Sequence, residues 1–577
     1  MNKHAIYHIT DVPYVYGKDT EILVIRIRTA SKDIKSCKIH YKDRYDWEND
    51  FIVKEMKESI ETDLFDFYEI EINVEEKRYR YFFELEDNQG NVFYVNERGI
   101  VKNKPLEPNA YQYPYLCLGD VYNEVNWAQE GIVYQIFPDR FYNGDISNDP
   151  KGAESWGGKV TPSNMFGGDL QGIIDKAQYL KELGITMIYL TPIFLSTSNH
   201  KYNTKDYYEI DPFFGDVKKA KEMVLACHNA GIRVIFDGVF NHSGHDFFAF
   251  QDVIEKGEES KYKDWYFIQD YPVNLDKPNY ITFANDVYTM PKLNTKNPEV
   301  QKYLLDVAEF WIKEVGIDGW RLDVCDEVDH SFWRAFRNRV KSVKEDSFII
   351  GEIMHEAASF LRGEQLDSIM NYPFREMCLD FFARRSISAG ELNNILEINR
   401  SLYTHSINRQ VLNLIDSHDT PRFLTECGGN INRMKLAIVL QYTYIGIPYI
   451  YYGDEVGMEG SKDPDCRRCM IWKEEDQNKE LLNMYKKLNS LRKEYKALTY
   501  APYKNLFKED NILAFVRESD DEKIFIAINN NDKSTKLKVD FNEAFDIYNN
   551  ININIEEGFL HLEPMSFKIL MCHNDSV

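Results

Sequence analysis

Short apolar segments alternate with longer amphipathic segments from about residue 131 to residue 495. We interpret eight apolar segments as strands: GIVYQIFPDRF (131–141), ITMIYLTPI (185–193), RVIFDGVFN (233–241), GWRLDV (319–324), SFIIGEI (347–353), DSIMNYP (367–373), VLNLIDSHD (411–419) and YIYYGDE (449–455). Helical periodicity lies between them, as in residues 169–184 and 298–316, and both of these stretches end in glycine, a common helix stop. Eight strands with intervening helices predict a (β/α)8 barrel with right-handed crossovers.

Segments typical of β-structure flank the predicted barrel. EILVIRIRT and RYRYFFELED before it, and ILAFVRESDDEKIFIAINN after it, alternate apolar and polar residues and predict a β-sandwich at each end. The proline-containing stretch KNKPLEPNAYQYPY (102–115) is typical of a linker. We therefore predict an α/β chain with three domains: an N-terminal β-sandwich (1–122), the barrel (123–500) with a subdomain inserted after the third strand (about 242–297), and a C-terminal β-sandwich (501–577).

The charge and the hydropathy pattern exclude several classes of partner. The formal net charge of -24 disfavours nucleic acid and anionic membrane surfaces, because both need clustered Lys and Arg. A neutral substrate fits better. No apolar run of 18 residues and no signal-peptide-like segment is present, so we expect a cytoplasmic protein that does not span a membrane. The nine cysteines contain a single CxxC pair, Cys466 and Cys469, which is a weak metal signal, and we expect reduced thiols.

Polar residues follow several predicted strands, where an active site is expected in a barrel of this kind. Arg321 and Asp323 end the fourth strand, and alternation along a strand points both to the same side. An arginine next to an aspartate favours the ionised carboxylate, which suits a nucleophile. Glu352 follows an apolar run, and partial burial would raise its pKa, which suits a general acid. The seventh strand ends in Ser417-His418-Asp419.

This inventory indicates a reaction class. The sequence contains no GxSxG, HExxH or P-loop motif. Two carboxylates on neighbouring barrel strands can lie about 5 Å apart, the spacing of a retaining glycosidase. One would attack the anomeric carbon, the other would protonate the leaving oxygen and then activate water, and a third would orient sugar hydroxyls.

The strand ends carry a family resemblance. DGVFNH (237–242), GWRLD (319–323), GE (351–352) and SHD (417–419) resemble, in order, the four signature regions of the α-amylase family of glycoside hydrolases. The resemblance implies that Asp323 is the nucleophile, Glu352 the acid/base and Asp419 the transition-state stabiliser. It implies a structural role for Asp237. Six further residues resemble substrate-binding residues of the family: Tyr202, His242, Arg321, His418, Asp463 and Arg467.

Two features are similar to one group within that family. MPKLN (290–294) and the N-terminal β-domain resemble those of the neopullulanases, cyclomaltodextrinases and maltogenic amylases. The resemblance implies hydrolysis of α-1,4 bonds in cyclodextrins, maltodextrins and pullulan, with transglycosylation as a further activity. It also implies a homodimer in which the N-terminal domain of each subunit walls the neighbour's active site.

The resemblance further implies one calcium ion. The six residues concerned lie in two short segments that resemble the group's calcium site: Asn143, Asp145, Asn148, Asp149, Gly167 and Asp169. Carboxylate, amide and carbonyl oxygens are the hard ligands that calcium prefers. An ordinary Asx-rich turn is the alternative interpretation.

Two departures from the family pattern bear on cleavage preference. Many relatives carry Ala-Asn where this chain has Cys325 and Asp326, and Trp where it has Met354. Both positions would lie on the leaving-group side, and methionine is adaptable but cannot stack on a sugar as tryptophan does. Two other functions stay open: an exo-acting α-glucosidase or α-1,6-glucosidase of the same fold, and a non-catalytic carbohydrate-binding protein.

Overall fold

The computed structural model describes residues 1–572 and divides into two compact units. The first comprises Met1–Glu124 with two short later segments, Leu361–Glu364 and Gly390–Asn408. The second comprises Val125–Phe360, Gln365–Ala389 and the chain from Arg409 onward. Among the described residues, no helix is both long and apolar enough to cross a bilayer.

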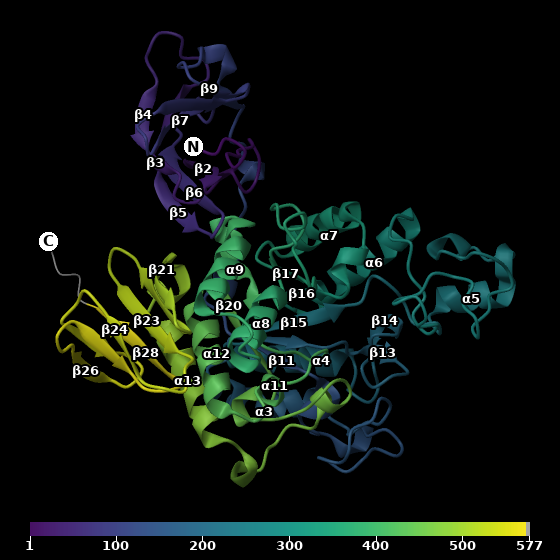
Figure 1. Ribbon diagram of the computed structural model, residues 1–577. Coiled ribbons are helices and arrows are strands. Elements are labelled where there is room, and N and C mark those ends of the chain that lie inside the picture. Colours follow the sequence, from purple (N-terminus) through teal and green to yellow (C-terminus); the bar gives the residue numbers. More distant parts are fainter. Residues whose placement is uncertain (573–577) are drawn as a thin grey trace. The chain divides into compact units, whose positions relative to one another are not determined.

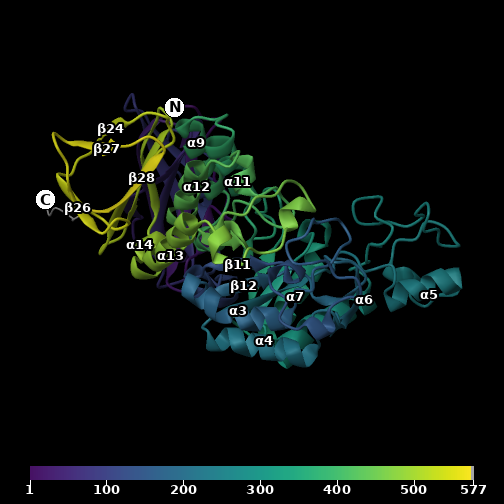
Figure 2. The same ribbon diagram turned by 90° about the horizontal axis from the view of Figure 1, so that it is seen from below.

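An eight-stranded parallel sheet forms the centre of the second unit (Figures 1 and 2). Its strands are β11 (Val133–Ile136), β12 (Met187–Leu190), β15 (Arg233–Gly238), β16 (Gly319–Leu322), β17 (Phe348–Gly351), β18 (Ser368–Ile369), β19 (Leu412–Asn413) and β20 (Ile447–Tyr451). Their order is β18-β17-β16-β15-β12-β11-β20-β19, and a parallel bridge between Met370 and Leu412 joins the two ends. The predicted (β/α)8 barrel is therefore confirmed.

The sixth and seventh strands are shorter than predicted, for reasons visible in the sequence. The segment 367–373 leaves the sheet early because the side chain of Asn371 accepts from the backbone amide of Phe374 and starts helix α8. Pro373 follows in the first turn, where a missing amide hydrogen costs nothing. Only Leu412 and Asn413 of the segment 411–419 pair as strand, so His418 and Asp419 lie in the loop beyond it.

One short helix, α1, precedes the first barrel strand, and the other helices of the barrel follow its strands. They are α1 (Asn126–Gln129), α2 (Pro138–Phe141), α3 (Leu170–Leu183), α4 (Val217–Asn229), α6 (Pro298–Phe310), α7 (His330–Val343), α8 (Tyr372–Cys378), α11 (Phe423–Glu426), α12 (Ile431–Thr443), α13 (Lys479–Glu494) and α14 (Ala497–Tyr500). Helix α3 ends at Gly184 with φ 94°, as the sequence predicts. The stretch 298–316 is not one regular helix, because a π-helical turn at Trp311–Val315 continues α6 as far as Gly316.

Bulky side chains fill the inside of the barrel. Tyr189, Ile235, Phe348 and Tyr449 are among a buried cluster contributed by different strands. A barrel interior packed in this way is a core and not a channel, so a site can form only where the strands end.

The connection after β15 forms the predicted insertion. Helix α5 (Phe248–Lys256) lies in it, and bridges between Tyr266 and Leu293 and between Thr282 and Pro291 hold it together. A separate two-stranded sheet, β13 (Phe194–Ser196) with β14 (Thr204–Ile210), follows β12. Residues 197–203 form the hairpin between these two strands and carry His200 and Tyr202.

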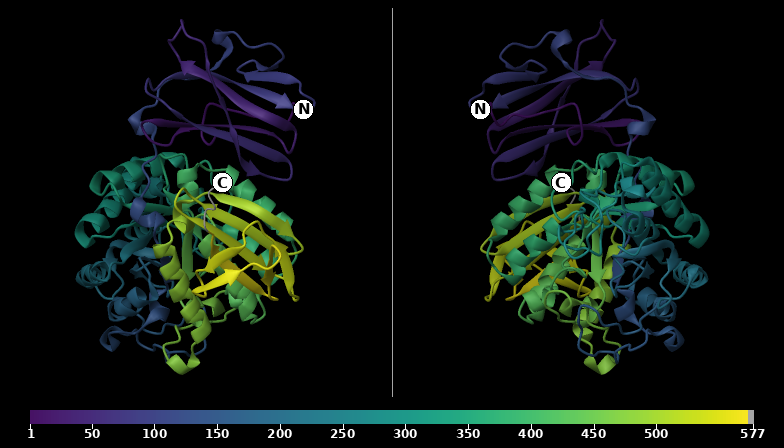
Figure 3. Two further views of the ribbon diagram at one scale, coloured as in Figure 1. Left: turned by 90° about the vertical axis from the view of Figure 1, so that its left-hand side faces the viewer. Right: turned by 90° about the vertical axis from the view of Figure 1, so that its right-hand side faces the viewer.

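The C-terminal domain predicted for 501–577 is all β over residues 503–571 (Figure 3), and residues 573–577 lie outside the described part. One sheet has the order β21-β22-β23-β28-β25-β26 and the other pairs β24 with β27. The strands are β21 (Tyr503–Glu509), β22 (Ile512–Glu518), β23 (Lys523–Asn529), β24 (Thr535–Lys538), β25 (Glu543–Asp546), β26 (Ile551–Asn554), β27 (Phe559–Leu562) and β28 (Ser566–Met571). Leu537, Leu560, Leu562 and Leu570 belong to their shared buried core.

The first unit contains two antiparallel sheets, β1-β2-β6-β5 and β4-β3-β7-β8-β9. The strands are β1 (Val15–Gly17), β2 (Ile22–Ala30), β3 (Ile34–Asp43), β4 (Ile52–Glu55), β5 (Lys57–Glu61), β6 (Phe65–Asn73), β7 (Tyr79–Asp87), β8 (Val92–Asn96), β9 (Gly99–Val101) and β10 (Tyr111–Tyr113). The prediction that residues 102–115 form a linker is wrong for part of the segment. Strand β10 lies in it and pairs with β7, and the neighbouring Ala110 is buried. Alternating tyrosines there suit a half-buried strand.

Helix α9 (Ala389–Ser401) and the start of α10 (His405–Gln410) belong mostly to the first unit, although they lie between barrel strands in the sequence. Nη2 of Arg400 donates to the carbonyl of Ser59 at 2.7 Å, and Nε2 of His405 lies 2.5 Å from Oε1 of Glu69. Nη1 of Arg26 donates to the carbonyl of Ser401 at 3.2 Å. These polar contacts attach the helical segment to β2, β5 and β6.

Candidate active site

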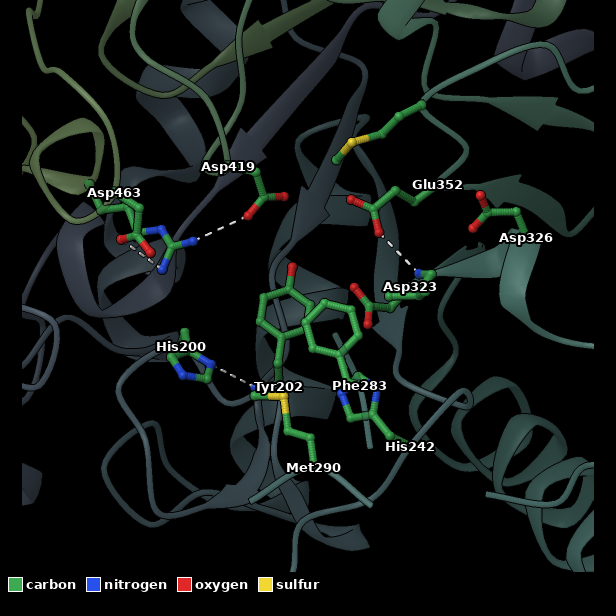
Figure 4. Close-up of a pocket in the computed structure, with 13 residues that line it drawn as sticks. His200, Tyr202, His242, Phe283, Met290, Asp323, Asp326, Glu352, Asp419 and Asp463 are labelled. Carbon is green, nitrogen blue, oxygen red and sulfur yellow. Dashed lines mark hydrogen bonds and ion pairs between the residues drawn. The ribbon is translucent and has the colours of Figure 1, made fainter. Parts of the chain in front are cut away.

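A pocket of about 520 Å³ opens where the barrel strands end (Figure 4). Its volume is in the usual range for small-molecule sites, about 300–1,000 Å³. Thirteen residues line it: His200, Tyr202, His242, Phe283, Met290, Asp323, Val324, Asp326, Glu352, Met354, Asp419, Asp463 and Arg467. The three carboxylates predicted to be catalytic therefore meet in one pocket.

Arg321 organises the base of this pocket. Its Nη1 lies 2.8 Å from Oδ1 of Asp323 and 3.1 Å from both carboxylate oxygens of Asp237. Its Nη2 lies 2.6 Å from Oε1 of Glu352. Arg321 is fully buried, so its single positive charge is shielded from solvent and is shared among three carboxylates.

The backbone after β16 turns sharply to hold Glu352. Val324 has φ 45° and ψ 47°, the left-handed region, which a β-branched residue rarely adopts. Its amide donates to Oε2 of Glu352 at 3.0 Å. Asp323 and Glu352 are thus held by one guanidinium group and one strained turn. This sharing favours the short carboxylate separation, about 5 Å, that retaining glycosidases use.

Burial dominates the titration of these carboxyl groups. It raises the pKa of Asp323, and repulsion from Glu352 raises that pKa further. Burial also raises the pKa of Glu352, which Arg321 opposes and Asp419 reinforces. It raises the pKa of Asp237 to about 6, although Arg321 and the Tyr189 hydroxyl pull the other way. The site therefore holds a proton at a pH where an isolated carboxyl would have lost it, as a general acid requires.

Tyr202 and His418 form the floor beside these groups. Their rings stack with an interplanar angle of 6°, and the Tyr202 hydroxyl lies 2.6 Å from Nε2 of His418. The same hydroxyl donates to Oδ2 of Asp237 at 3.1 Å. Nδ1 of His418 lies 2.6 Å from the side-chain amide of Gln135 on β11. Burial lowers the pKa of His418 well below its usual value, so the ring is neutral.

His242 lies at the other side of the floor. Burial lowers its pKa to about 3, and its ring packs against Phe283 with 5.2 Å between centroids. Within residues 1–572, its buried Nε2 has no hydrogen-bond partner. A buried ring nitrogen without a partner carries a desolvation cost, and a sugar hydroxyl would satisfy it.

Asp419 is held by a second arginine. Nη2 of Arg467 lies 3.2 Å from Oδ1 of Asp419, and Nη1 lies 3.1 Å from Asp463. Nε of Arg467 donates to the carbonyl of His418 at 2.8 Å. The predicted residues of the 463–467 segment therefore reach the predicted stabiliser. Burial of Asp463 raises its pKa, which the Arg467 charge opposes.

The predicted calcium residues lie together, since Asn143 donates to Asp149 and Asn148 donates to Asp169. Oδ1 of Asn143 and Oδ1 of Asn148 are buried and accept no hydrogen bond from any described residue. Gly167 has φ 78°, and a Cβ there would lie 2.3 Å from Oδ1 of Asp149. Asp169 is engaged differently, because it accepts from the amides of residues 144, 145 and 172 and caps α3. The described residues contain no group of three or more His, Cys, Asp or Glu side chains suited to a metal, so any ion here would bind chiefly to amide, carbonyl and single carboxylate oxygens.

Sequence reasoning missed several residues of the site. Tyr189 donates to Oδ2 of Asp237 at 2.6 Å, and Gln135 orients His418. Both residues lie on short apolar strands. The only sign of a functional role in the sequence is that each carries a polar group, an amide or a hydroxyl, within an otherwise apolar segment. Phe283 comes from the insertion and His200 from the β13–β14 hairpin, and nothing in their local pattern distinguishes these two residues from core residues. Met290 opens the MPKLN motif of the insertion, but the motif did not predict that its side chain lines the pocket.

The chain matches three protein families along its length. Residues 1–117 match the alpha amylase N-terminal ig-like domain, residues 135–501 the alpha amylase catalytic domain, and residues 505–569 the maltogenic amylase C-terminal domain. The second match covers more than half of the chain and includes all of the pocket.

Similar proteins match this chain over nearly its whole length. The chain is 51% identical to a cyclomaltodextrinase of Thermoanaerobacter pseudethanolicus over 99% of this chain and 100% of the relative. It is 46% identical to neopullulanase 2 of Thermoactinomyces vulgaris over 93% of both chains. A solved structure of a cyclomaltodextrinase superposes with a TM-score of 0.94 at 39% identity, covering 99% of this chain and 100% of that one.

Proposed function

The chain belongs to the α-amylase family of glycoside hydrolases, and we propose that within it the protein opens cyclodextrins and cleaves α-1,4 bonds of maltodextrins and pullulan. The observation that carries the proposal is the joint hold of Arg321 on Asp323 and Glu352 at one end of the pocket. Relatives named cyclomaltodextrinase and neopullulanase, similar over at least 93% of this chain, support the choice of substrate.

In the first step, Asp323 attacks the anomeric carbon while Glu352 protonates the glycosidic oxygen that leaves. Arg321 keeps Asp323 ionised when Glu352 carries the shared proton. The product is a glycosyl ester of Asp323. In the second step, Glu352 takes a proton from water, whose oxygen displaces Asp323 from the anomeric carbon. Asp419, positioned by Arg467, orients sugar hydroxyls as positive charge develops on the ring.

The test is a comparison of β-cyclodextrin, pullulan and soluble starch, each incubated with the purified protein, with products identified by chromatography. We expect rapid conversion of cyclodextrin to maltose and release of panose from pullulan. Glucose as the sole product would indicate an exo-acting α-glucosidase, and cleavage only at branch points an α-1,6-glucosidase. No hydrolysis of any substrate would favour a carbohydrate-binding protein.

The catalytic roles have their own test. We expect Asp323→Asn and Glu352→Gln each to lower kcat by at least about 1,000-fold, because each removes a group that forms or breaks a bond. Added azide should restore part of the rate of Glu352→Gln through a glycosyl azide product, and should not help Asp323→Asn. Activity of Asp323→Asn within about tenfold of the unmodified protein would contradict its role as nucleophile.

We also propose one calcium ion at residues 143–169. Asn143, Asn148, Asp149 and the Gly167 carbonyl would supply its oxygens, while Asp145 and Asp169 arrange the segment. The ion would neutralise Asp149 and fix the loop before α3. Calorimetry on chelated protein should show uptake of about one calcium per chain, with a rise of a few degrees in Tm at saturating ion. Asn148→Ala should reduce both effects, and no uptake by the unmodified protein would exclude the site.

Two further proposals concern assembly and location. A homodimer through the N-terminal domain rests on the resemblance to the neopullulanase group, and sedimentation of the full chain across a range of concentrations tests it. A cytoplasmic location is supported by 40% identity, over 91% of this chain, to a protein of Bacillus subtilis named intracellular maltogenic amylase. Fractionation of producing cells should place the activity in the cytosol and not in the medium.

A further inference from the structure

The pocket has two halves, and one of them is not used by the groups described so far (Figure 4). His200, Asp419 and Asp463 lie on one side of the reacting carboxylates, and Asp326 lies on the other side, next to Glu352. Because Glu352 gives its proton to the leaving oxygen, the leaving sugar must occupy the half on the Asp326 side. Any sugar that later attacks the glycosyl-enzyme must enter the same half.

Asp326 is held in place by the short 3-10 turn Cys325–Glu327 that follows β16. The amide of Cys325 donates to the carbonyl of Glu352 at 3.2 Å. At the other end of the turn, Nζ of Lys292 donates to the carbonyl of Glu327 at 2.9 Å and also contacts Asn241. With both ends of its turn tied, the Asp326 carboxylate is positioned before a substrate arrives.

His355 holds the Asp326 side chain itself. Its Nε2 lies 2.8 Å from Oδ2 of Asp326, and its Nδ1 lies 2.8 Å from the carbonyl oxygen of Glu356. A carboxylate and a carbonyl can only accept, so both ring nitrogens must carry hydrogen for both bonds to form. The two contacts together therefore require the imidazolium form of His355.

The charges around His355 favour that form. The Glu356 carbonyl and the Asp326 carboxylate raise the pKa of His355, and the negative charge of Glu356 adds to the effect. The other charged groups at this turn are Glu327 and Lys292, a partly buried residue of the insertion, and Nζ of Lys292 lies 3.5 Å from Oε2 of Glu327. When the pH rises above the pKa of His355, the ring loses a proton and one of its two contacts. The bond to Asp326 then loses its charge assistance where Nε2 keeps the hydrogen, or is lost where Nδ1 keeps it, so in both cases Asp326 is held less firmly.

We propose that Asp326, positioned by His355, binds the sugar on the leaving-group side and thereby sets how the glycosyl-enzyme divides between water and a sugar acceptor. This proposal rests on the proposed function, since it needs the covalent intermediate. Oδ2 of Asp326 is taken by His355, and no described residue donates to Oδ1, which is left to accept from a sugar hydroxyl. Met354, which directly precedes His355, also lines the pocket and is 54% exposed, so its flexible side chain can cover the apolar face of a bound sugar.

The transfer step follows the same chemistry as hydrolysis. A hydroxyl of the acceptor gives its proton to Glu352 and its oxygen attacks the anomeric carbon. The ester bond to Asp323 breaks, and Asp323 leaves as a carboxylate. Water and sugar both need Glu352 as base, so its titration cancels in the ratio of transfer to hydrolysis. A pH dependence of that ratio reports on the acceptor-side contacts alone.

The experiment uses α-maltosyl fluoride, because fluoride leaves without occupying the leaving-group half as a sugar does. The glycosyl-enzyme formed from it is divided between water and added glucose, and chromatography gives the ratio of maltotriose-type products to maltose from about pH 5.5 to pH 8. The variants are His355→Ala, His355→Gln and Asp326→Ala. His561→Gln is the matched control, because His561 is exposed on β27 in the C-terminal domain.

For the unmodified protein and His561→Gln, the ratio should fall about three- to tenfold as pH rises, the effect of one charge-assisted hydrogen bond. Asp326→Ala and His355→Ala should give the low ratio at every pH. His355→Gln, whose amide donates without titrating, should give an intermediate ratio that does not change with pH. The proposal would be overturned if His355→Ala gave the same ratio of transfer to hydrolysis as the unmodified protein, with the same pH dependence. It would also be overturned if the unmodified protein transferred nothing to glucose at any pH. Failure of the unmodified protein to release fluoride would instead refute the proposed function.

Discussion

Nη2 of Arg321 lies 2.6 Å from Oε1 of Glu352, while Nη1 of the same side chain lies 2.8 Å from Oδ1 of Asp323. The planar guanidinium group can make both contacts because its two terminal nitrogens point in fixed, different directions. Arg321 thus fixes the position of the proposed nucleophile and of the proposed acid/base with one side chain. A substitution at this residue should disturb both.

We predict that Arg321→Lys lowers kcat/KM on maltotriose by at least about 100-fold, close to 3 kcal/mol. A lysine ammonium is one compact charge and cannot reach Asp323 and Glu352 together. Arg339→Lys is the matched control, since Arg339 pairs with Asp306 and Glu309 on partly exposed helices. It should keep kcat/KM within about twofold, as expected for a surface pair. Equal activity of the two variants would contradict the role given to Arg321.

Tyr202→Phe tests the floor of the pocket. The variant keeps the ring that stacks on His418 but loses the hydroxyl that bridges Nε2 of His418 and Oδ2 of Asp237. We predict a fall of about tenfold in kcat with a smaller change in KM, because two buried polar groups lose a partner near the reacting carbon. Tyr208→Phe, outside the pocket, should leave both constants unchanged. A change in KM alone would mean that the hydroxyl contributes only to ground-state binding.

The sequence was sufficient to predict the barrel and the meeting of its acidic residues. Asp323, Glu352 and Asp419 each follow a short apolar segment, and parallel strands in a closed barrel bring their ends to one face. Strand order is enough to bring Asp323 and Glu352 together, whereas Asp419 lies in the loop beyond β19, where Arg467 contacts it. The Arg321 contact with Asp323 also follows from alternation, because the two residues are two positions apart.

Contacts between distant segments could not be predicted in this way. Gln135 reaches His418, and Lys292 reaches Glu327, only because the barrel closes and the insertion folds back over it. The left-handed backbone at Val324 has no signal in its residue type, since valine normally avoids that conformation. The assignment of α9 to the first unit likewise depends on tertiary contacts and not on helical periodicity.

A prediction about stability concerns the opposite end of the barrel. Asp318, just before β16, is buried and accepts from His228, Arg233 and Lys344 at 2.6–2.9 Å and from the amide of Val234 at 2.8 Å. Burial alone would raise the pKa of Asp318, but the bonds from His228 and Lys344 hold it well below the usual range. Asp318→Asn should therefore destabilise the barrel by about 2 kcal/mol, because three partly exposed cations lose their counter-charge and the buried side chain loses its charge-assisted hydrogen bonds.

Activity should separate this effect from catalysis. At a temperature where Asp318→Asn is folded, its kcat should equal that of the unmodified protein, since the N-terminal ends of barrel strands do not carry the active site. Glu345→Gln, an exposed neighbour, should change neither Tm nor kcat. Thermal unfolding and initial rates measure the two properties independently. A fall in kcat without a fall in Tm would show that Asp318 acts on the pocket.

The last prediction concerns the pH dependence of the first unit. Burial would raise the pKa of Glu69, but Arg26 and His405 outweigh it and lower that pKa to about 2, below its usual value of 4.5. The unfolded chain therefore binds more protons at this group than the folded chain between pH 4.5 and pH 2. Its stabilising contribution, about 3 kcal/mol, is complete above this window and is lost as the pH falls through it.

Glu69→Gln should accordingly lower the Tm of the first unit at pH 7, and the difference from the unmodified protein should shrink as the pH falls from about 4.5 towards 2. Glu71→Gln is the control on the same strand, because its pair with Lys18 is about half exposed and should contribute little at any pH. Thermal unfolding followed by circular dichroism at several pH values gives both differences. A Tm difference for Glu69→Gln that stays constant down to about pH 2.5 would mean that the ion pairs of Glu69 do not stabilise the fold, and that the substitution acts through packing alone.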